Sequence, residues 1–248
     1  MNKAIGWAAT LLALVISTTA LAADRVLMVV SSHQQMGDTQ EKTGFWMAEL
    51  THPYFALTRA GLDVDVASIA GGMAPVDPRS LAEPDSANQR FLNNPATRML
   101  IDHSKVLAKV DPKDYKAVVF VGGHGTMWDF PNNPAVNRIA ARIYDKGGVV
   151  AAVCHGPAAL LGITLKDGSK LLAGKQVTGF ANTEEDEVGL SKVVPFSLQD
   201  QLIEAGARYS KGLNWQPKVV VDGRLITGQN PASAHQLGLA VAKAVKGA

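Results

Sequence analysis

The 248-residue sequence has only one cysteine, Cys154. A single cysteine has no partner in its own chain, which excludes an internal disulfide and a cysteine-rich zinc site. The sequence also has no large excess of charge of either sign, since it contains 24 basic and 22 acidic residues and its formal net charge is +2. We therefore expect no nucleic acid among the partners of this protein.

The sequence also lacks a hydrophobic run long enough to span a bilayer. Its longest candidate is the apolar stretch 4–16, well short of the roughly 20 residues that a membrane helix needs. Lys3 precedes this stretch and Ala20-Leu21-Ala22 follows it, which is the layout of a secretory signal peptide. We expect cleavage after Ala22, no membrane partner, and a secreted protein that is periplasmic if the source is a Gram-negative bacterium.

The sequence contains 47% apolar residues, as a globular protein does, and short apolar runs alternate with helical patterns along it. Short apolar runs predict strands at Arg25–Ser31, Leu62–Ile69, Ala117–Val121 and Val149–Val153. Helices are predicted over Thr43–Ala60, from Asn133 to Gly147, from Pro157 onward, and over Ser233–Val245. Asp222-Gly223 predicts a hairpin. This alternation indicates an α/β fold, with a mostly parallel sheet sandwiched by helices.

One stretch departs from the alternation. Residues 71–116 carry five prolines with helical pieces between them. We interpret this stretch as a small cap or lid insertion over the sheet edge and not as a separate domain. Residues 23–248 are thus expected to form a single α/β domain.

Cys154 lies between the predicted strand Val149–Val153 and the helix expected at Pro157. A residue on a sharp strand-to-helix turn is held above the carboxyl edge of the sheet, as in the nucleophile elbows of hydrolases. The amino end of a helix would also favour a thiolate. The alternative is that Cys154 is an inert buried thiol.

The segment 149–158, VVAAVCHGPA, resembles the nucleophile elbow of the DJ-1/PfpI superfamily, which is related to class I glutamine amidotransferase domains. Three further segments resemble its heat-inducible chaperone and glyoxalase III branch. They are Lys42-Thr43-Gly44 with Glu49 and His52-Pro53, Gly122 to Thr126 with Asp129, and Thr227 to Ser233. The resemblance implies a flavodoxin-like doubly wound sheet and a homodimer.

The same resemblance assigns roles to individual residues. It implies a catalytic group of Cys154, His155 and Glu49, in which a protonated Glu49 donates a hydrogen bond to the thiolate. An acid after the strand expected at Val177–Phe180 would orient His155, and spacing favours Glu185 among the four acids at 184–187. Gly123 and His155 are expected to supply the amides of an oxyanion hole, and His124 either lines the pocket or caps its loop.

Neither a metal nor any other cofactor is expected. The remaining histidines show no paired metal-ligand spacing; they are His33, His52, His103 and His235.

The activity implied is a glutathione-independent glyoxalase III reaction, in which a Cys154 hemithioacetal carries methylglyoxal to lactate or glyoxal to glycolate. The substrate is then a small reactive aldehyde and the enzyme a lyase. One alternative is a cysteine hydrolase, such as a peptidase, amidase or protein deglycase. The other is a holdase-type chaperone, whose activity should survive the loss of Cys154.

Overall fold

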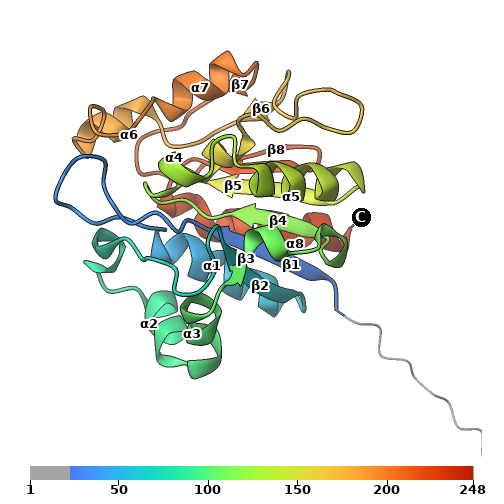
Figure 1. Cartoon of the computed structure of the whole chain (residues 1–248), viewed down its shortest axis with the longest axis horizontal. Helices are drawn as coiled ribbons and strands as arrows, with labels where there is room; N and C mark the ends of the chain where they lie inside the picture. The colour runs from blue at the N-terminus through green and yellow to red at the C-terminus, as the bar shows by residue number, and fades with distance from the viewer. Residues whose placement is uncertain (1–22, 248) are drawn as a thin grey trace, which may run out of the picture.

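Seven strands form one sheet, in the order β3-β2-β1-β4-β5-β9-β8 (Figure 1). They are β1 (Arg25–Val30), β2 (Asp63–Ser68), β3 (Lys105–Val106), β4 (Ala117–Phe120), β5 (Val149–Val153), β8 (Val219–Asp222) and β9 (Leu225–Gly228). This computed structural model describes residues 23–247. The predicted signal peptide, residues 1–22, lies outside the described residues.

Within this sheet β8 and β9 pair antiparallel, and the other neighbours pair in parallel. Strands β4 and β5 bury every side chain and β1 buries all but the first, as continuous apolar runs in a parallel sheet predict. β1 lies between β2 and β4, so the strand order reverses at β1 as it does in flavodoxin-like sheets. The predicted α/β fold with a mostly parallel sheet is confirmed.

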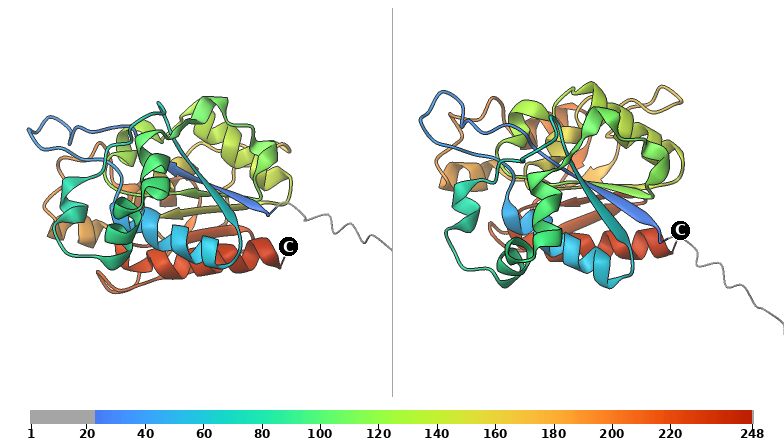
Figure 2. Two further views of the ribbon diagram at one scale, coloured as in Figure 1. Left: turned by 90° about the horizontal axis from the view of Figure 1, so that it is seen from below. Right: turned by 60° about the horizontal axis from the view of Figure 1, so that its bottom comes forward.

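Helices cover both faces of the sheet (Figure 2). The helices α1 (Met47–Arg59) and α8 (Ala234–Lys246) lie side by side on one face, and α5 (Pro134–Asp145) covers the other. The Asn133 side chain caps α5 by accepting from the amides of Ala135 and Val136. The buried positions of α5 follow the 3.6-residue period of a helix, and this period determines which face of α5 packs on β4 and β5.

The segment 71–116 contains η1 (Pro78–Leu81), α2 (Ser86–Asn93), α3 (Pro95–Asp102), β3, η2 (Leu107–Lys109) and η3 (Pro112–Asp114). Its strand β3 pairs with β2 at the edge of the sheet, while α2 packs on α1. The 3-10 turn η1 brings one residue of this segment, Arg79, to the site described below.

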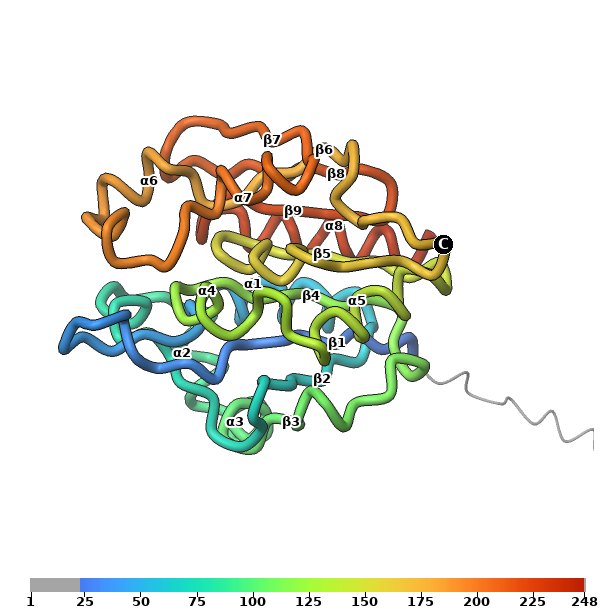
Figure 3. Tube along the Cα trace, turned by 45° about the horizontal axis from the view of Figure 1, so that its top comes forward, coloured from blue at the N-terminus to red at the C-terminus, as the bar shows by residue number. Residues whose placement is uncertain are grey.

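A second layer lies beside the β8–β9 end of the sheet (Figure 3). It contains a small parallel sheet of β6 (Gln176–Val177) and β7 (Arg208–Tyr209), with α6 (Asn182–Glu187) and α7 (Leu198–Glu204). The short elements α4 (Thr126–Asp129), η4 (Gly156–Leu160) and η5 (Pro231–Ser233) follow β4, β5 and β9. Over residues 23–247, no helix is both long and apolar enough to cross a membrane.

Three predicted elements differ from the structure. The helix predicted over Thr43–Ala60 begins only at Met47, because Phe45 pairs instead with Val76 in an isolated parallel bridge. The strand expected at Val177–Phe180 is confined to β6, and Phe180 hydrogen-bonds to the backbone of Cys154. The helix expected from Pro157 is only the 3-10 turn η4.

Candidate active site

Cys154 stands at the end of β5 in a left-handed backbone conformation, with φ of 59°. A left-handed residue with a side chain costs free energy, so neighbouring contacts must hold it. The Cys154 amide donates to the carbonyl of Gly228 at 2.9 Å, and its carbonyl accepts from the amide of Phe180 at 2.8 Å. These two bonds tie the turn to β9 on one side and to the loop after β6 on the other.

His155 continues the turn and places its ring against the cysteine. Its Nδ1 lies 3.3 Å from the Cys154 sulfur, and its Nε2 lies 2.7 Å from Oε2 of Glu185. The His155 side chain is buried. The structure thus brings together Cys154, His155 and Glu185 in one chain of contacts, with the imidazole in the middle.

Glu185 accepts from a second imidazole with its other oxygen. His124, in the loop after β4, lies 2.8 Å from Oε1 through its Nε2. The His124 and His155 rings are 4.0 Å apart between centroids. Burial opposes ionisation of Glu185, but electrostatic interaction with His155 and the hydrogen bonds from both histidines hold the pKa of the carboxyl well below its usual range.

Arg79 fixes the tautomer of His124. A guanidinium nitrogen of Arg79 lies 3.1 Å from Nδ1 of His124, and a guanidinium can only donate. Nδ1 therefore accepts, and the proton of neutral His124 is on Nε2, facing Glu185. Burial lowers the pKa of His124 to about 4, so its contact with Glu185 is a hydrogen bond of a neutral imidazole and not an ion pair.

Glu49, in the first turn of α1, lies beneath the cysteine and is completely buried. Neither of its carboxyl oxygens has a hydrogen bond of ordinary geometry. Burial raises the pKa of Glu49, and its nearest polar neighbours, the Cys154 thiol and the Gly122 amide, oppose that shift only in part. Burial thus favours a protonated Glu49 next to the sulfur. Its role as a hydrogen-bond donor to the thiolate, which the family resemblance implies, stays a prediction.

Burial also raises the pKa of the Cys154 thiol, and a negative charge on Glu49 would raise it further. The Gly123 amide acts in the opposite direction by facing the sulfur. Burial and mutual repulsion therefore disfavour the state in which Glu49 and Cys154 are both ionised. When Glu49 holds a proton, the repulsion disappears and the carboxyl can donate to a thiolate. The single 3-10 turn η4 is too short to supply the dipole of a full helix, so the predicted helix contribution is wrong.

Two glycines after β4 make the close approach of these groups possible. A Cβ on Gly122 would lie 2.5 Å from a Glu49 oxygen and 2.9 Å from Cβ of Cys154. Gly123 has φ of 101°, which side chains rarely adopt. The Gly123 amide faces the sulfur. The role of the Gly123 and His155 amides as an oxyanion hole stays a prediction.

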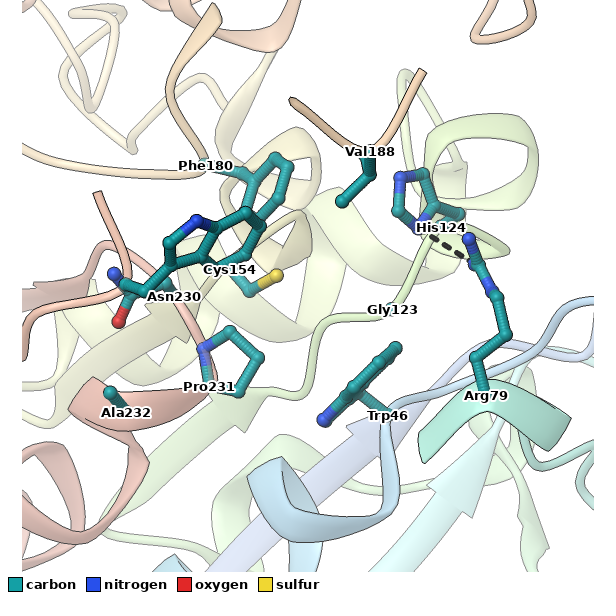
Figure 4. Close-up of a pocket in the computed structure, with 11 residues that line it drawn as sticks. Trp46, Arg79, Gly123, His124, Cys154, Phe180, Val188, Asn230, Pro231 and Ala232 are labelled. Atoms are coloured by element: carbon teal, nitrogen blue, oxygen red, sulfur yellow. Dashed lines mark hydrogen bonds between the residues drawn. The ribbon is translucent and has the colours of Figure 1, made fainter. Parts of the chain in front are cut away.

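A cavity of about 560 Å³ opens above the sulfur (Figure 4). Most of its wall is apolar, with Trp46 and Pro231 on one side of the sulfur and Phe180 on the other in this view. Arg79 and His124 supply the polar end. The cavity lies at the carboxyl ends of β4 and β5, where ligands bind in open parallel sheets.

Comparisons with known proteins agree with this arrangement. Residues 42–244 match the DJ-1/PfpI family. The chain belongs to the DJ-1/PfpI family. The family prediction from the elbow and its companion motifs is therefore confirmed.

Several relatives in this family match over most of their length. The chain is 35% identical to a Saccharomyces cerevisiae protein named glutathione-independent glyoxalase HSP31, over 91% of this chain and all of the relative. It is 30% identical to the crystal structure of Candida albicans glyoxalase III, with a TM-score of 0.83 over 89% of this chain and 97% of that one. A Francisella tularensis protein, rapid encystment protein 24 kDa, is 46% identical with a TM-score of 0.87, covering 90% and 99% of the two chains.

One group of side chains in this DJ-1/PfpI protein has the donors of a metal site. His124, His155 and Glu185 each offer a ligand atom, and these atoms lie within 4.8 Å of one another. Two imidazoles and a carboxylate are ligands that zinc accepts. Here, however, the Nε2 nitrogens already face the Glu185 oxygens in hydrogen bonds, and the cationic Arg79 borders the group. These residues could hold a cation only by giving up those bonds.

Two functional neighbours were not predicted. Arg79 reaches His124 from a segment 45 residues earlier, and nothing local in the sequence marks it. Glu184, next to the predicted acid, is completely buried and accepts from the Asn230 side chain and the Trp215 amide. Glu184 thus holds the Trp215 and η5 loops in place, while Glu185 faces His155. The position of Asn230 within the motif Thr227 to Ser233 is the one signal that could have indicated this pairing.

Proposed function

We propose that this protein is a glutathione-independent glyoxalase that converts methylglyoxal to lactate and glyoxal to glycolate. The observation that carries the proposal is the position of the Cys154 sulfur, which lies 3.3 Å from Nδ1 of His155, next to the buried Glu49, and lines the cavity. Relatives that match over most of the chain bear the name glutathione-independent glyoxalase, which supports the same reaction.

The first step is addition to the aldehyde. The Cys154 thiolate forms a C–S bond with the aldehyde carbon, and the carbonyl oxygen takes the proton held by Glu49 to give a hemithioacetal. Glu49 holds the thiolate before addition by donating its O–H to the sulfur, and the amides of Gly123 and His155 face the oxygen as it gains charge.

The second step moves a hydrogen between neighbouring carbons. His155 Nδ1 is the base placed beside the sulfur-bearing carbon, and it takes the proton from that carbon to give an enediol. His155 returns this proton to the adjacent carbon, while the hydroxyl proton of the hemithioacetal moves to the neighbouring ketone oxygen, which gives the thioester of a 2-hydroxy acid. Glu185 stabilises the imidazolium that exists between the two transfers, because it accepts from Nε2 at 2.7 Å.

The third step is hydrolysis of that thioester. Water attacks the acyl carbon, the C–S bond breaks to release the Cys154 thiolate, and the proton left over from the water returns to Glu49. The sum is one aldehyde and one water to one hydroxy acid, with no net oxidation. The proposal requires neither glutathione nor a metal nor any other cofactor.

A steady-state assay tests this function. Purified wild type is compared with Cys154→Ala and Cys154→Ser on methylglyoxal, glyoxal and an unstructured peptide, with no glutathione present. We expect turnover of both aldehydes and its loss by at least ~10³-fold in either variant, as for removal of other catalytic nucleophiles. Wild-type turnover by Cys154→Ala would contradict the proposal. Peptide cleavage without aldehyde turnover would favour the hydrolase alternative.

The same two proteins separate catalysis from a chaperone role. A holdase uses exposed apolar surface and does not need the thiol, so suppression of client aggregation by Cys154→Ala at the wild-type level would identify an independent activity. Loss of both activities together would tie the protection to aldehyde removal.

We also propose that residues 1–22 direct export, with cleavage after Ala22, and that the mature chain is a homodimer. The first strand begins at Arg25, so the proposed cleavage leaves β1 intact. Expression of the full chain in a Gram-negative host tests both: a periplasmic product that begins at Ala23 and sediments as a dimer is expected.

A further inference from the structure

The cavity above Cys154 is far larger than the substrates proposed so far require. Methylglyoxal has three carbons and two oxygens, so it fills at most about 150 Å³ if each non-hydrogen atom takes no more than the ~30 Å³ share of a water molecule. The cavity measures about 560 Å³. Its size is that of a pocket for a larger, drug-sized ligand.

The chemistry of the wall agrees with the size. Three aromatic side chains face the cavity, namely Trp46, Phe180 and Trp215, and Pro231 and Val188 add aliphatic surface. Phe180 and Trp215 form an edge-to-face pair with centroids 5.7 Å apart. Trp215 and Val188 are partly exposed, at 41% and 39%, so they border the open side of the cavity. Exposed apolar side chains that converge on a cavity mark a binding site for an apolar group.

The rigidity of this wall indicates that it is built for a ligand. Trp215 has a positive φ of 60°, which a bulky residue adopts only when neighbours hold it. Its amide donates to Glu184 at 2.9 Å, and its indole N–H donates to Glu187. Two acids of α6, the helix that also carries Glu185, thus hold Trp215: Glu184 holds its backbone and Glu187 its indole.

We propose that this cavity selects 2-oxoaldehydes that carry a bulky apolar group, such as an aryl group, over methylglyoxal and glyoxal. The inference rests on the proposed glyoxalase function and names its substrate class. The aldehyde carbon meets the Cys154 sulfur, and the substituent on the neighbouring ketone lies against the aromatic wall. For phenylglyoxal the product is mandelate, formed with water by the same hydrogen shift that gives lactate from methylglyoxal.

The decisive measurement compares kcat/KM for phenylglyoxal and methylglyoxal with the wild-type protein. Phenylglyoxal fills about 300 Å³ at the same share per atom, so it fits the cavity. We expect at least a tenfold preference for phenylglyoxal, since it buries several more carbon atoms in the cavity than methylglyoxal does. A higher kcat/KM for methylglyoxal overturns the inference and leaves the proposed function intact. Absence of turnover for both overturns the proposed function.

A binding experiment tests the inference without turnover. The fluorescence of the tryptophans that line the cavity reports binding of the two products, mandelate and lactate, which do not modify arginine as oxoaldehydes can. We expect a Kd for mandelate at least tenfold lower than for lactate. Equal dissociation constants overturn the inference whether or not the protein is a glyoxalase.

Two variants locate the effect on the wall. Trp215→Ala removes the largest partly exposed ring, and Ala232→Leu narrows the cavity from its rim without cutting any hydrogen bond of Trp215. Each should lower the ratio of phenylglyoxal to methylglyoxal kcat/KM by about tenfold. Leu239→Ala, which truncates an exposed side chain of α8 away from the cavity, should leave the ratio unchanged. A ratio that stays at the wild-type value in both wall variants overturns the inference.

Discussion

The sulfur of Cys154 lies 3.3 Å from Nδ1 of His155, the next residue in the chain. In a continuing strand these two side chains would point to opposite faces. The left-handed conformation of Cys154, followed by a right-handed helical His155, instead brings the buried His155 ring against the sulfur that lines the cavity. A nucleophile and its base can therefore be neighbours in sequence, provided that an acid fixes the far side of the imidazole.

Glu49→Gln should lower kcat on methylglyoxal by about 10²–10⁴-fold with little change in KM, because the amide cannot pass a proton as a carboxyl can. The fold should persist, and the melting temperature should equal or exceed that of wild type, since the change removes the cost of burying an ionisable group. Initial rates and thermal unfolding measure the two effects. Glu83→Gln, an exposed matched change, should alter neither. An undiminished kcat in Glu49→Gln would show that the buried carboxyl has no role in the reaction.

Glu185→Gln should lower kcat by a similar factor, about 10²–10⁴-fold. A glutamine has only one acceptor oxygen, so its NH2 group would face the Nε2–H of either His124 or His155. Asp186→Asn is the matched control, since Asp186 is exposed and bonds to Ser191 instead of a histidine. We expect the control to stay within about twofold of wild type. Equal losses in the two variants would show that the effect comes from α6 as a whole and not from the Glu185 carboxylate.

The sequence was sufficient to predict the elements that depend on local pattern. Apolar runs predict β1, β4 and β5, and the Asp222-Gly223 turn predicts the β8–β9 hairpin. The elbow followed from the same reasoning. The strand ends just before Cys154 and Pro157 begins the next element, so the chain must turn sharply between them. Resemblance to a known family added Glu49, which helical sequence alone would have assigned to a solvated surface.

Contacts between distant segments could not be predicted from the sequence. Arg79 reaches His124 across 45 residues, and its role depends on where η1 packs and on no feature of its own neighbourhood. Spacing favoured Glu185 among four consecutive acids, but only the packing of α6 shows that Glu184 holds loops while Glu185 faces the histidines. The overlong helix prediction at Thr43 failed for the same reason, since the Phe45–Val76 bridge is a tertiary contact.

Zinc should inhibit the enzyme and chelators should not. The donor atoms of His124, His155 and Glu185 lie close enough to bind a cation, but doing so would remove the proton that His155 shares with Glu185. We expect full turnover in excess chelator, and loss of turnover in micromolar zinc that chelator reverses. His124→Asn should weaken the zinc inhibition by removing one ligand. Loss of turnover after dialysis against chelator, with recovery on adding a divalent ion, would contradict the metal-free reaction.

The stability of the fold should fall as the pH drops from about 6.5 to about 4, because of His124. An unfolded histidine takes up a proton near pH 6.5, whereas burial lowers the pKa of His124 to about 4 in the folded protein. Between these values the unfolded state binds more protons, so the free energy of unfolding rises with pH. The contribution of His124 reaches its full size above about pH 6.5. Glu185, whose pKa is lowered by its histidines, acts in the same direction at lower pH. The His124 contribution amounts to about 3 kcal/mol.

Urea unfolding across this range should show a flatter pH dependence for His124→Gln than for wild type. The pH dependence should be unchanged for His103→Gln, which alters an exposed histidine. Parallel curves for wild type and His124→Gln would show that His124 is not held neutral in the folded protein.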